Sequence, residues 1–267
     1  MANIPITSTQ NNKVKLAFKL RFKRSREQSQ RFVIEYYRDL ERAIEQGYQL
    51  DYAFFCEELA SEGDWYIMRM LDPHLIHPVT EQVMVKTSYR QNPGGLLAVM
   101  VAPPLPHISQ LDPAYAGSVL ALVNLQIPGN IGALLRTADA TGFMTVMVDT
   151  SLDLYNPNII RSSTGTCFLN TIYAANSRDA IDYFKQNRYQ VFASHLDGAT
   201  SLFDINLADR SAIIMGTEDT GLDEFWVQQC DSLVKIPMIG QVADSLNVSV
   251  SGAIFMYEAL RQRLQSS

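Results

Sequence analysis

The sequence predicts an α/β protein whose larger, C-terminal part is a mainly parallel sheet with helices on both faces. From residue 117 onward, short apolar segments alternate with amphipathic ones, as in strand–helix–strand units that build parallel sheets. Four prolines fall between residues 103 and 113, and proline disfavours both a helix interior and a central strand because it lacks the amide donor. We therefore expect a smaller α/β domain at 1–102, a linker at 103–116 and the larger domain at 117–267.

The first domain is predicted to combine helices with strands. Residues 14–60 favour helix overall, and within them the stretch 31–47 carries apolar side chains mostly three or four positions apart before Gly47 ends the pattern. Those side chains are Phe32, Ile34, Tyr37, Leu40 and Ile44. DYAFFCEE favours a strand, IHPV and EQVMVKTSY favour shorter mixed elements, and GGLLAVMVAPP favours a buried strand that prolines end.

The second domain is predicted to alternate strands with helices. The expected strands are VLALVNLQI (119–127), FMTVMVD (143–149), YQVFASH (189–195) and SAIIMG (211–216). The expected helices are NIGALLRTADATG (130–142), SRDAIDYFKQNR (177–188) and SVSGAIFMYEALRQRL (249–264). The last of these is apolar around most of its circumference, so we expect it to be buried on more than one side.

Charge separates a short N-terminal segment from the rest of the chain. The net charge is −6, whereas the segment from Lys13 to Arg31 holds eight basic side chains against Glu27 alone. Such a segment is either a solvated helix face or a basic arm that meets RNA phosphates. The side chains that we assign to RNA contact are Lys19, Arg21, Lys23 and Arg24.

Composition disfavours several classes of protein. The sequence has no run of about 18 apolar residues, so no membrane-spanning helix is expected. The polar N-terminus lacks the apolar core of a secretion signal. Cys56, Cys167 and Cys230 are odd in number and far apart, which favours a reducing cytoplasm over a disulfide framework. Together with the four histidines they form no recognisable zinc pattern, so no metal is expected.

Three loops that follow strands of the second domain carry the residues expected of a site, because ligands of parallel sheets bind at the carboxyl ends of strands. The first loop, 127–143, has a Pro-Gly turn followed by Asn130 at the expected N-cap of a helix, with Arg136 further along that helix. On its own, this loop is equally typical of an ordinary capped turn.

The other two loops also follow strands and carry small or polar residues. The second, 213–225, leads from a buried strand into Gly216, Glu218 and Gly221, and such glycines allow a ligand to approach backbone amides. The third, 235–263, follows a strand that Pro237 ends. It opens the last helix at Ser245-Leu246-Asn247, where the small residues Ser249, Ser251, Gly252 and Ala253 favour a close helix contact.

In this order, the three loops together resemble the three motifs of the SpoU/TrmH family of RNA methyltransferases, within the SPOUT superfamily. The first motif, N-x-G-x-x-x-R-T-A, is matched by Asn130, Gly132, Arg136, Thr137 and Ala138. The second, G-x-E-x-x-G-L, is matched by Gly216, Glu218, Gly221 and Leu222. The third is matched by Ile236 to Met238 and by Ser245 to Val250, and an intermediate S-x-G by Ser163 and Gly165. The match covers about residues 119–264, and the first domain resembles the ribosomal-protein-like substrate domain found ahead of many members.

The resemblance implies a fold, a reaction and an assembly. It implies a parallel sheet whose C-terminal segment is tucked into a deep trefoil knot, a homodimer with shared active sites, and methylation of a ribose 2′-hydroxyl by S-adenosyl-L-methionine. Structured RNA is the implied substrate, ribosomal RNA ahead of transfer RNA. The implied cofactor-binding residues are Gly216, Ile236, Leu246 and Ser194. His195 is an alternative to Ser194, although its position is more typical of a core or surface histidine.

The implied catalytic residues are Asn130, Arg136, Glu218, Ser245 and Asn247. The family assigns Arg136 a central role, sometimes as a general base, but a guanidinium is effectively never deprotonated in proteins. We therefore expect Arg136 to hold the target's phosphate and to favour loss of the hydroxyl proton, with Glu218 orienting it. In-line alignment of the reactants can supply about 7–11 kcal/mol in favourable cases.

The sequence departs from the family pattern at two positions. Ile127 stands where an Asp usually precedes the Pro-Gly turn, and Tyr36 stands where a Gly usually follows Glu35. The alternative function is an RNA-binding protein that keeps the fold without catalysis. A Rossmann-type small-molecule methyltransferase would need a G-x-G-x-x-G loop after its first strand, and the sequence has none.

Overall fold

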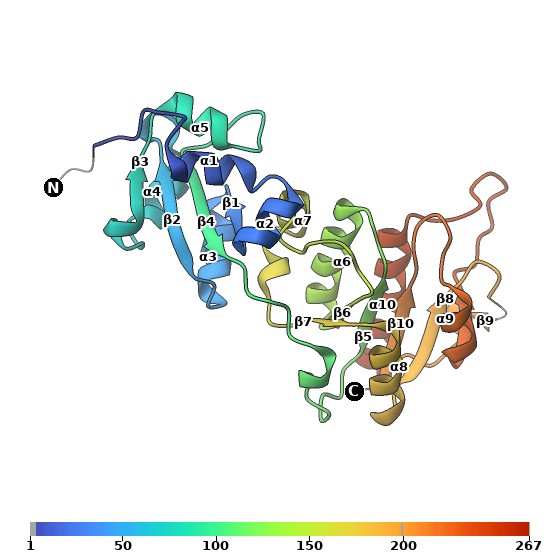
Figure 1. Ribbon diagram of the computed structural model, residues 1–267. Helices are drawn as coiled ribbons and strands as arrows, with labels where there is room; N and C mark the ends of the chain where they lie inside the picture. The colour runs from blue at the N-terminus through green and yellow to red at the C-terminus, as the bar shows by residue number, and fades with distance from the viewer. Residues whose placement is uncertain (1–3, 199, 267) are drawn as a thin grey trace. The chain divides into compact units, whose positions relative to one another are not determined.

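The computed structural model describes residues 4–198 and 200–266, which form two compact units (Figure 1). The first unit contains the chain up to Pro104 together with Asp153–Asn170. The second contains Leu105–Leu152 and the chain from Thr171 onward. The sequence-based division counts 153–170 with the larger domain, whereas in the structure this segment packs within the first unit.

A four-stranded sheet organises the described part of the first unit (Figure 1). Its strands, in spatial order, are β1 (Arg31–Ile34), β4 (Leu96–Val101), β2 (Leu50–Phe55) and β3 (Ile76–Pro78). The strand β4 is antiparallel to both of its neighbours, and β3 runs parallel to β2. The helices are α1 (Asn12–Lys19), α2 (Lys23–Ser29), α3 (Tyr37–Glu45), α4 (Glu62–Met68), α5 (Glu81–Thr87) and α7 (Pro157–Ser163). Short 3₁₀ turns are η1 (Glu57–Leu59), η2 (Pro73–Leu75) and η4 (Thr166–Phe168).

The helix predicted over 31–47 is wrong in its first part. Residues Arg31–Ile34 form β1, which pairs with β4, and the helix begins only at Tyr37. Phe32, Val33 and Ile34 are all buried. The spacing of Phe32 and Ile34 fits the two-residue repeat of a strand, and it continues without a gap into the helical repeat of α3. The spacing of apolar residues alone therefore did not locate the boundary between β1 and α3.

Aromatic stacking joins the segment 153–170 to the first unit. The ring of Tyr155 stacks on that of Phe32 with 4.4 Å between centroids, and Phe168 lies 5.7 Å from Phe32 on a similar plane. Asp153 forms an ion pair with Arg26, with 2.5 Å between Oδ2 and Nε, and Arg26 is only 3% exposed. This segment therefore supplies both apolar area and a buried counter-charge to the first unit.

One acidic residue of α3 is buried. Asp39 is 6% exposed, and burial raises its pKa to about 6, against a smaller opposing effect of Arg42. Burial raises a carboxyl pKa because a low-polarity surrounding disfavours the charged form.

The described residues of the second unit form a seven-stranded sheet in which every pair of neighbours is parallel. Its strands are β5 (Val119–Val123), β6 (Met144–Val148), β7 (Ile172–Ala175), β8 (Gln190–Ser194), β9 (Thr200–Ser201), β10 (Ser211–Met215) and β11 (Ser232–Lys235). The spatial order is β7-β6-β5-β10-β8-β11-β9. The predicted mainly parallel sheet is confirmed.

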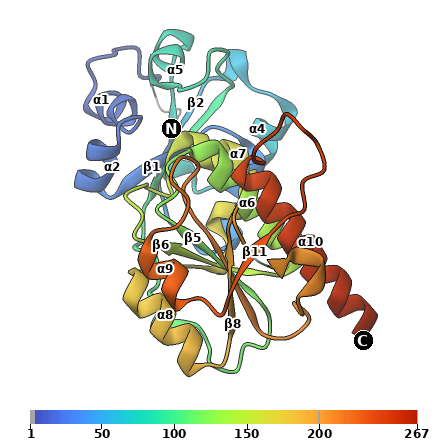
Figure 2. The same cartoon turned by 90° about the vertical axis from the view of Figure 1, so that its right-hand side faces the viewer.

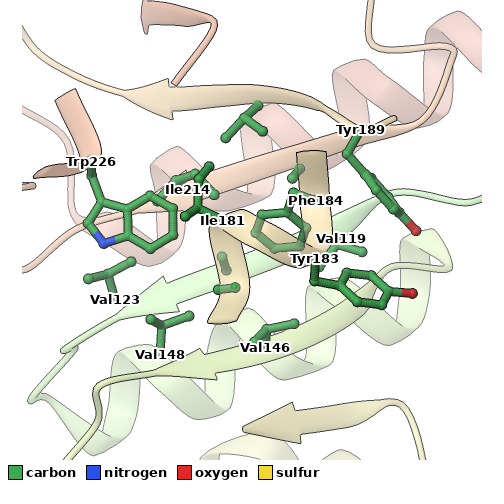
Figure 3. Packing of buried hydrophobic residues seen from close by; sticks show 14 of the residues in the cluster. Val119, Val123, Val146, Val148, Ile181, Tyr183, Phe184, Tyr189, Ile214 and Trp226 are labelled. Atoms are coloured by element: carbon green, nitrogen blue, oxygen red, sulfur yellow. The ribbon is translucent and has the colours of Figure 1, made fainter. Parts of the chain in front are cut away.

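Helices cover both faces of this sheet, as predicted (Figure 2). The helices are α6 (Pro128–Thr141), α8 (Ser177–Gln186), α9 (Glu224–Gln229) and α10 (Val248–Ser266), with the turns η3 (Ile108–Gln110) and η5 (Leu202–Asp204). Ile181 and Phe184 of α8 and Trp226 of α9 pack on one face, over Val119 and Ile214 (Figure 3).

The helices α6 and α10 pack against each other on the opposite face. Gly252 makes this contact close, since a Cβ on it would lie 2.3 Å from Cδ2 of Leu134. The close helix contact expected from the small residues of the last helix is therefore present at Gly252. It places the start of α10 beside α6, where two of the three predicted site loops end.

Candidate functional site

The three predicted loops leave the same edge of the parallel sheet. The first joins β5 to α6, the second joins β10 to α9, and the third joins β11 to α10 (Figure 2). The strand β10 pairs with both β5 and β8, and β8 pairs with β11. Because all these strands are parallel, their carboxyl ends and the loops that follow them lie together, where ligands of such sheets bind.

Hydrogen bonds join one residue of each loop into a polar chain. Nδ2 of Asn130 donates to Oε1 of Glu218 over 2.7 Å, and Nδ2 of Asn247 donates to Oδ1 of Asn130 over 3.1 Å. Asn130 is buried, and Oδ1 of Asn247 accepts hydrogen bonds from the backbone and hydroxyl of Ser249. We call Asn130, Glu218 and Asn247 the polar chain.

The structure corrects two details of the first and second loops. Asn130 is not the N-cap of α6, because the helix begins at Pro128 with Ile127 as its cap. Proline tolerates this position because its missing amide would be unbonded there anyway. Glu218 does not orient Arg136, since it is bonded to Asn130 instead, and no hydrogen bond or ion pair joins it to Arg136 among the described residues.

Arg136 lies about two turns into α6 with its side chain exposed. Within residues 4–198 and 200–266, its guanidinium takes part in no hydrogen bond or ion pair. Five N–H donors are therefore available to an anionic partner from outside the chain.

A cavity of about 550 Å³ lies where the third loop meets the end of β8. Ser194, Ile236 and Leu246, predicted as cofactor-binding residues, all line it, and so does Ser245, predicted as catalytic. Ser245 is exposed and directly precedes Leu246 and Asn247 in the chain. The cavity and the polar chain therefore meet within Ser245–Asn247.

Gly216, the fourth predicted cofactor residue, does not line this cavity. It is buried, and a Cβ on it would lie 2.4 Å from the backbone of Gly221. Thr217 and Gly221 exchange backbone hydrogen bonds of 3.0 and 3.1 Å, which closes the second loop tightly around Gly216. Glycine is therefore required at position 216, because the backbone of Gly221 occupies the space that a Cβ would need.

Sequence reasoning missed most of the charged groups in the cavity wall. These are Asp197, Lys235 and Asp244, and His195, named only as an alternative, lies there too. Nδ1 of His195 accepts a hydrogen bond from the amide of Asp197 over 3.1 Å. A general signal existed for two of these four side chains, since His195 directly follows β8 and Lys235 ends the adjacent strand β11.

The predicted RNA-contacting residues differ in their surroundings. Lys19 and Arg24 are exposed and form no ion pair in the described part of the chain, whereas Lys23 pairs with Glu27 over 3.4 Å. Nη2 of Arg21 donates to the carbonyl oxygens of Lys86 and Ser88, and its guanidinium lies 4.0 Å from the ring centre of Phe18. Arg21 thus supports the structure of the first unit.

No helix of the described chain is long and apolar enough to cross a membrane. Among residues 4–198 and 200–266, no group of three or more His, Cys, Asp or Glu side chains is placed to hold a metal ion.

Fold and site together define a parallel-sheet α/β domain with a ligand cavity and a polar chain at its strand ends, joined to a smaller α/β unit. Comparison with known proteins gives the family. Residues 117–257 match the SpoU rRNA methylase family, and residues 11–98 match the MRM3-like substrate binding domain. The chain belongs to the SpoU rRNA methylase family.

Relatives match over nearly the whole chain. The 23S rRNA guanosine 2′-O-methyltransferase RlmP of Bacillus subtilis is 28% identical, covering 94% of this chain and 97% of its own length. A crystal structure of an RNA 2′-O ribose methyltransferase is 37% identical, with a TM-score of 0.85 and coverage of 98% and 100%. An AdoMet-bound rRNA methyltransferase from Sinorhizobium meliloti is 25% identical, with a TM-score of 0.85 and coverage of 97% of both chains.

Proposed function

We propose that this protein transfers a methyl group from S-adenosyl-L-methionine to a ribose 2′-hydroxyl in structured RNA. The observation that carries the proposal is the junction at Ser245–Asn247, where a cavity of cofactor size adjoins the polar chain. A cavity of about 550 Å³ lies within the range of roughly 300–1,000 Å³ that small-molecule sites occupy. Membership of a methylase family supports catalysis over the alternative of an RNA-binding protein that has lost it.

The chemistry of the cavity wall fits this cofactor. Ile236 and Leu246 offer apolar surface to the adenine ring. The carboxylates of Asp197 and Asp244 would oppose the cationic sulfonium and amino groups, and Lys235 would oppose the carboxylate. When bound, the cofactor supplies an electrophilic methyl group whose departure neutralises the positive sulfur. The AdoMet-bound relative from Sinorhizobium meliloti also supports this assignment.

The chain's own residues would act mainly by positioning. The free guanidinium of Arg136 is suited to hold an RNA phosphate, because its planar fork matches phosphate oxygens. Ser245 lines the cavity and would bond the acceptor hydroxyl. The polar chain fixes the three loops relative to one another, so that alignment of hydroxyl and methyl supplies much of the rate.

Ribosomal RNA is the substrate that we propose ahead of transfer RNA. RlmP acts on 23S rRNA by its name, and its match extends over both units of this chain. The match of residues 11–98 to a substrate binding domain supports a role for the first unit in engaging the RNA. We propose the cytoplasm as the location of the protein, because an RNA substrate of this kind is found there.

We also propose that the protein acts as a homodimer and that its C-terminal segment forms the trefoil knot implied by the family resemblance. Along α10, apolar side chains at Val250, Ile254, Tyr257 and Leu264 share one stripe, and Leu264 is 72% exposed. A second copy of the chain could cover this stripe through a two-fold interface, which uses the same patch twice.

The proposal is tested by methyl transfer with labelled cofactor. The purified chain is incubated with methyl-labelled S-adenosyl-L-methionine and unmethylated rRNA or tRNA, and the product is hydrolysed with alkali. A 2′-O-methyl group blocks cleavage at its own nucleotide, so the label is expected in alkali-resistant dinucleotides, from rRNA more than from tRNA. Label in a base, or calorimetric binding of the cofactor without transfer to any RNA, would contradict the proposed reaction.

A further inference from the structure

The first unit contains a second, polar recess that the proposed reaction does not use. It has a volume of about 580 Å³ and is lined by Tyr36, by Tyr89 and Arg90 in the loop after α5, and by Asn158 and Arg161 of α7. A smaller hollow shares Tyr36, Tyr89, Arg90 and Arg161 with it. All of these residues belong to the first unit. We call this the tyrosine recess.

Two aromatic rings and two cations are gathered in the recess. Tyr36 is 39% exposed and Tyr89 is 43% exposed. The guanidinium of Arg90 lies 4.3 Å from the ring centre of Tyr36. Nη2 of Arg161 donates to Oδ1 of Asn158 over 3.1 Å. Neither arginine is in an ion pair anywhere in the part of the chain that the structure describes. With the Glu35 carboxylate in the adjoining hollow, the two guanidinium groups give the recess a net positive charge.

Hydrogen bonds hold the wall of the recess in place. The carboxylate of Glu35 accepts bonds of 2.6 Å from the Ser88 hydroxyl and from the Tyr89 amide. The amide of Arg90 donates to the Ser88 hydroxyl over 3.0 Å, and Nδ2 of Asn158 donates to the Tyr89 hydroxyl over 3.2 Å. The Tyr89 ring is therefore presented on a fixed loop, which lowers the ordering cost of binding.

These groups match the chemistry of an unpaired nucleotide. Every base has a flat π face that stacks on an exposed aromatic ring, and every nucleotide carries a phosphate that an arginine can hold. The amides of Asn158 and of Asn92, which also lines the recess, can bond to a base edge. A paired duplex hides the faces of its bases, and an acidic peptide offers charge without such faces.

We infer that the tyrosine recess binds one or two unpaired nucleotides of the RNA substrate, with a base stacked on Tyr36 and phosphates at Arg90 and Arg161. The inference rests on the proposed function and adds an RNA contact made by residues of the first unit. Tyr36 occupies the position where the family pattern has glycine, so the stacking surface distinguishes this chain from members that follow the pattern. The recess would therefore select RNAs that contain an unpaired segment.

The test uses the full chain and a single-stranded RNA of about ten nucleotides that contains 2-aminopurine, whose fluorescence falls when it stacks. Binding should quench this fluorescence. Tyr36→Ala should weaken binding about 5- to 100-fold, the range that loss of one base–ring stack produces, and should reduce the quenching. Tyr36→Phe keeps the ring and should behave as the parent. Tyr66→Ala, which removes an exposed tyrosine of α4 outside the recess, is the matched control.

A stability measurement and two further variants keep the inference testable if Tyr36→Ala does not fold. Tyr36 makes no side-chain cap bond to α3, so the alanine variant should unfold at the parent's urea concentration. Arg90→Gln and Arg161→Gln leave both rings in place and should each lower the salt dependence of binding by the amount expected for about one phosphate. A fully paired RNA of the same length should bind the parent and Tyr36→Ala equally.

The inference and the proposed function fail in different ways. If the parent methylates RNA while Tyr36→Ala binds and quenches the oligonucleotide as the parent does, the recess has no such role and the reaction stands. Equal weakening of duplex and single strand by Tyr36→Ala would also overturn the inference. If no RNA is methylated but the quenching still depends on Tyr36, the recess binds unpaired RNA and the proposed reaction is wrong.

Discussion

Asn130 donates a 2.7 Å hydrogen bond to Glu218, and this bond joins the first loop of the site to the second. Because Asn247 donates to the same Asn130 side chain over 3.1 Å, the third loop is held through it as well. A buried amide in this position acts as both donor and acceptor, which a carboxylate at neutral pH cannot do. The arrangement of the three loops therefore depends on one side chain.

Asn130→Asp should place two carboxylates against each other and remove the donor to Glu218. We expect the free energy of unfolding to fall by about 1–3 kcal/mol and methyl transfer to fall at least ~10-fold, because a buried group loses its partner. Urea unfolding and single-turnover transfer measure the two effects. Asn206→Asp is the matched control, since Asn206 makes an exposed amide–carboxylate bond of 2.9 Å with Asp209. Full activity of Asn130→Asp would show that the polar chain has no catalytic role.

Arg136→Ala should nearly abolish methyl transfer while cofactor binding stays within a few fold. The reason is that the guanidinium of Arg136 makes no hydrogen bond or ion pair within the described chain and does not line the cofactor cavity. Isothermal titration measures the cofactor, and label transfer to RNA measures the reaction. Arg136→Lys should recover only part of the activity, because an ammonium group lacks the planar fork. Loss of cofactor binding together with activity would refute the role assigned to Arg136.

The basic segment is expected to meet RNA through its exposed members. Replacing Lys19, Lys23 and Arg24 with Ala should flatten the dependence of RNA affinity on salt, by about 0.7–0.9 in the log–log slope for each phosphate that is no longer neutralised. Arg21 is left in place because it bonds to the carbonyls of Lys86 and Ser88.

The matched control removes the same charge from the other unit. Arg178, Lys185 and Arg188 are three exposed basic residues on and just after α8, and their replacement with Ala should leave the slope as it is. An unchanged slope in the first triple variant would identify the basic segment as a solvated helix face.

The sequence predicted the second unit better than the first, and the reason is physical. Parallel strands that are buried on both faces produce continuous apolar runs, such as β5 and β10, which are easy to recognise. In the first unit, the apolar side chains of β1 continue without a gap into those of the helix that follows, so the two elements merged into one predicted helix. The short strand β9 and the half-buried β7 carry too little pattern to be recognised.

The site residues, too, were predicted only where a local sequence pattern marked them. Asn130, Glu218 and Asn247 lie in motifs with a family pattern, and the structure brings them together. Asp197 and Lys235 reach one cavity only because β8 pairs with β11, and strand pairing between distant segments leaves no local signal. The placement of 153–170 in the first unit likewise depends on long-range stacking of Tyr155 on Phe32.

The proposed dimer predicts a particle of twice 30.0 kDa in analytical ultracentrifugation at low micromolar concentration. Val250→Asp together with Tyr257→Asp should yield monomers and lower methyl transfer, because charge on the apolar stripe of α10 would be buried at the interface. Phe203→Asp, at an exposed apolar residue of the same unit outside the stripe, is the control and should remain dimeric. A fully active 30.0 kDa parent monomer would rule out the dimer.

Asp39 should make the first unit less stable as pH rises. Its pKa is raised from 3.8 to about 6 by burial, so between these values the folded chain binds more protons than the unfolded chain. The free energy of unfolding therefore falls as pH rises from about 4 to 6, and stays lower above that range. A pKa change of this size corresponds to about 3 kcal/mol.

Asp39→Asn should remove this dependence, because an amide carries no charge at any of these pH values. Relative to the parent, the variant should therefore gain about 2–3 kcal/mol of unfolding free energy between pH 4 and pH 7. Urea unfolding at intervals across this range measures the gain. Glu45→Gln removes an exposed carboxylate from the same helix α3 and should show no comparable gain. Parallel pH profiles for Asp39→Asn and the parent would mean that Asp39 is ionised in the folded chain at no cost, through contacts that offset its burial.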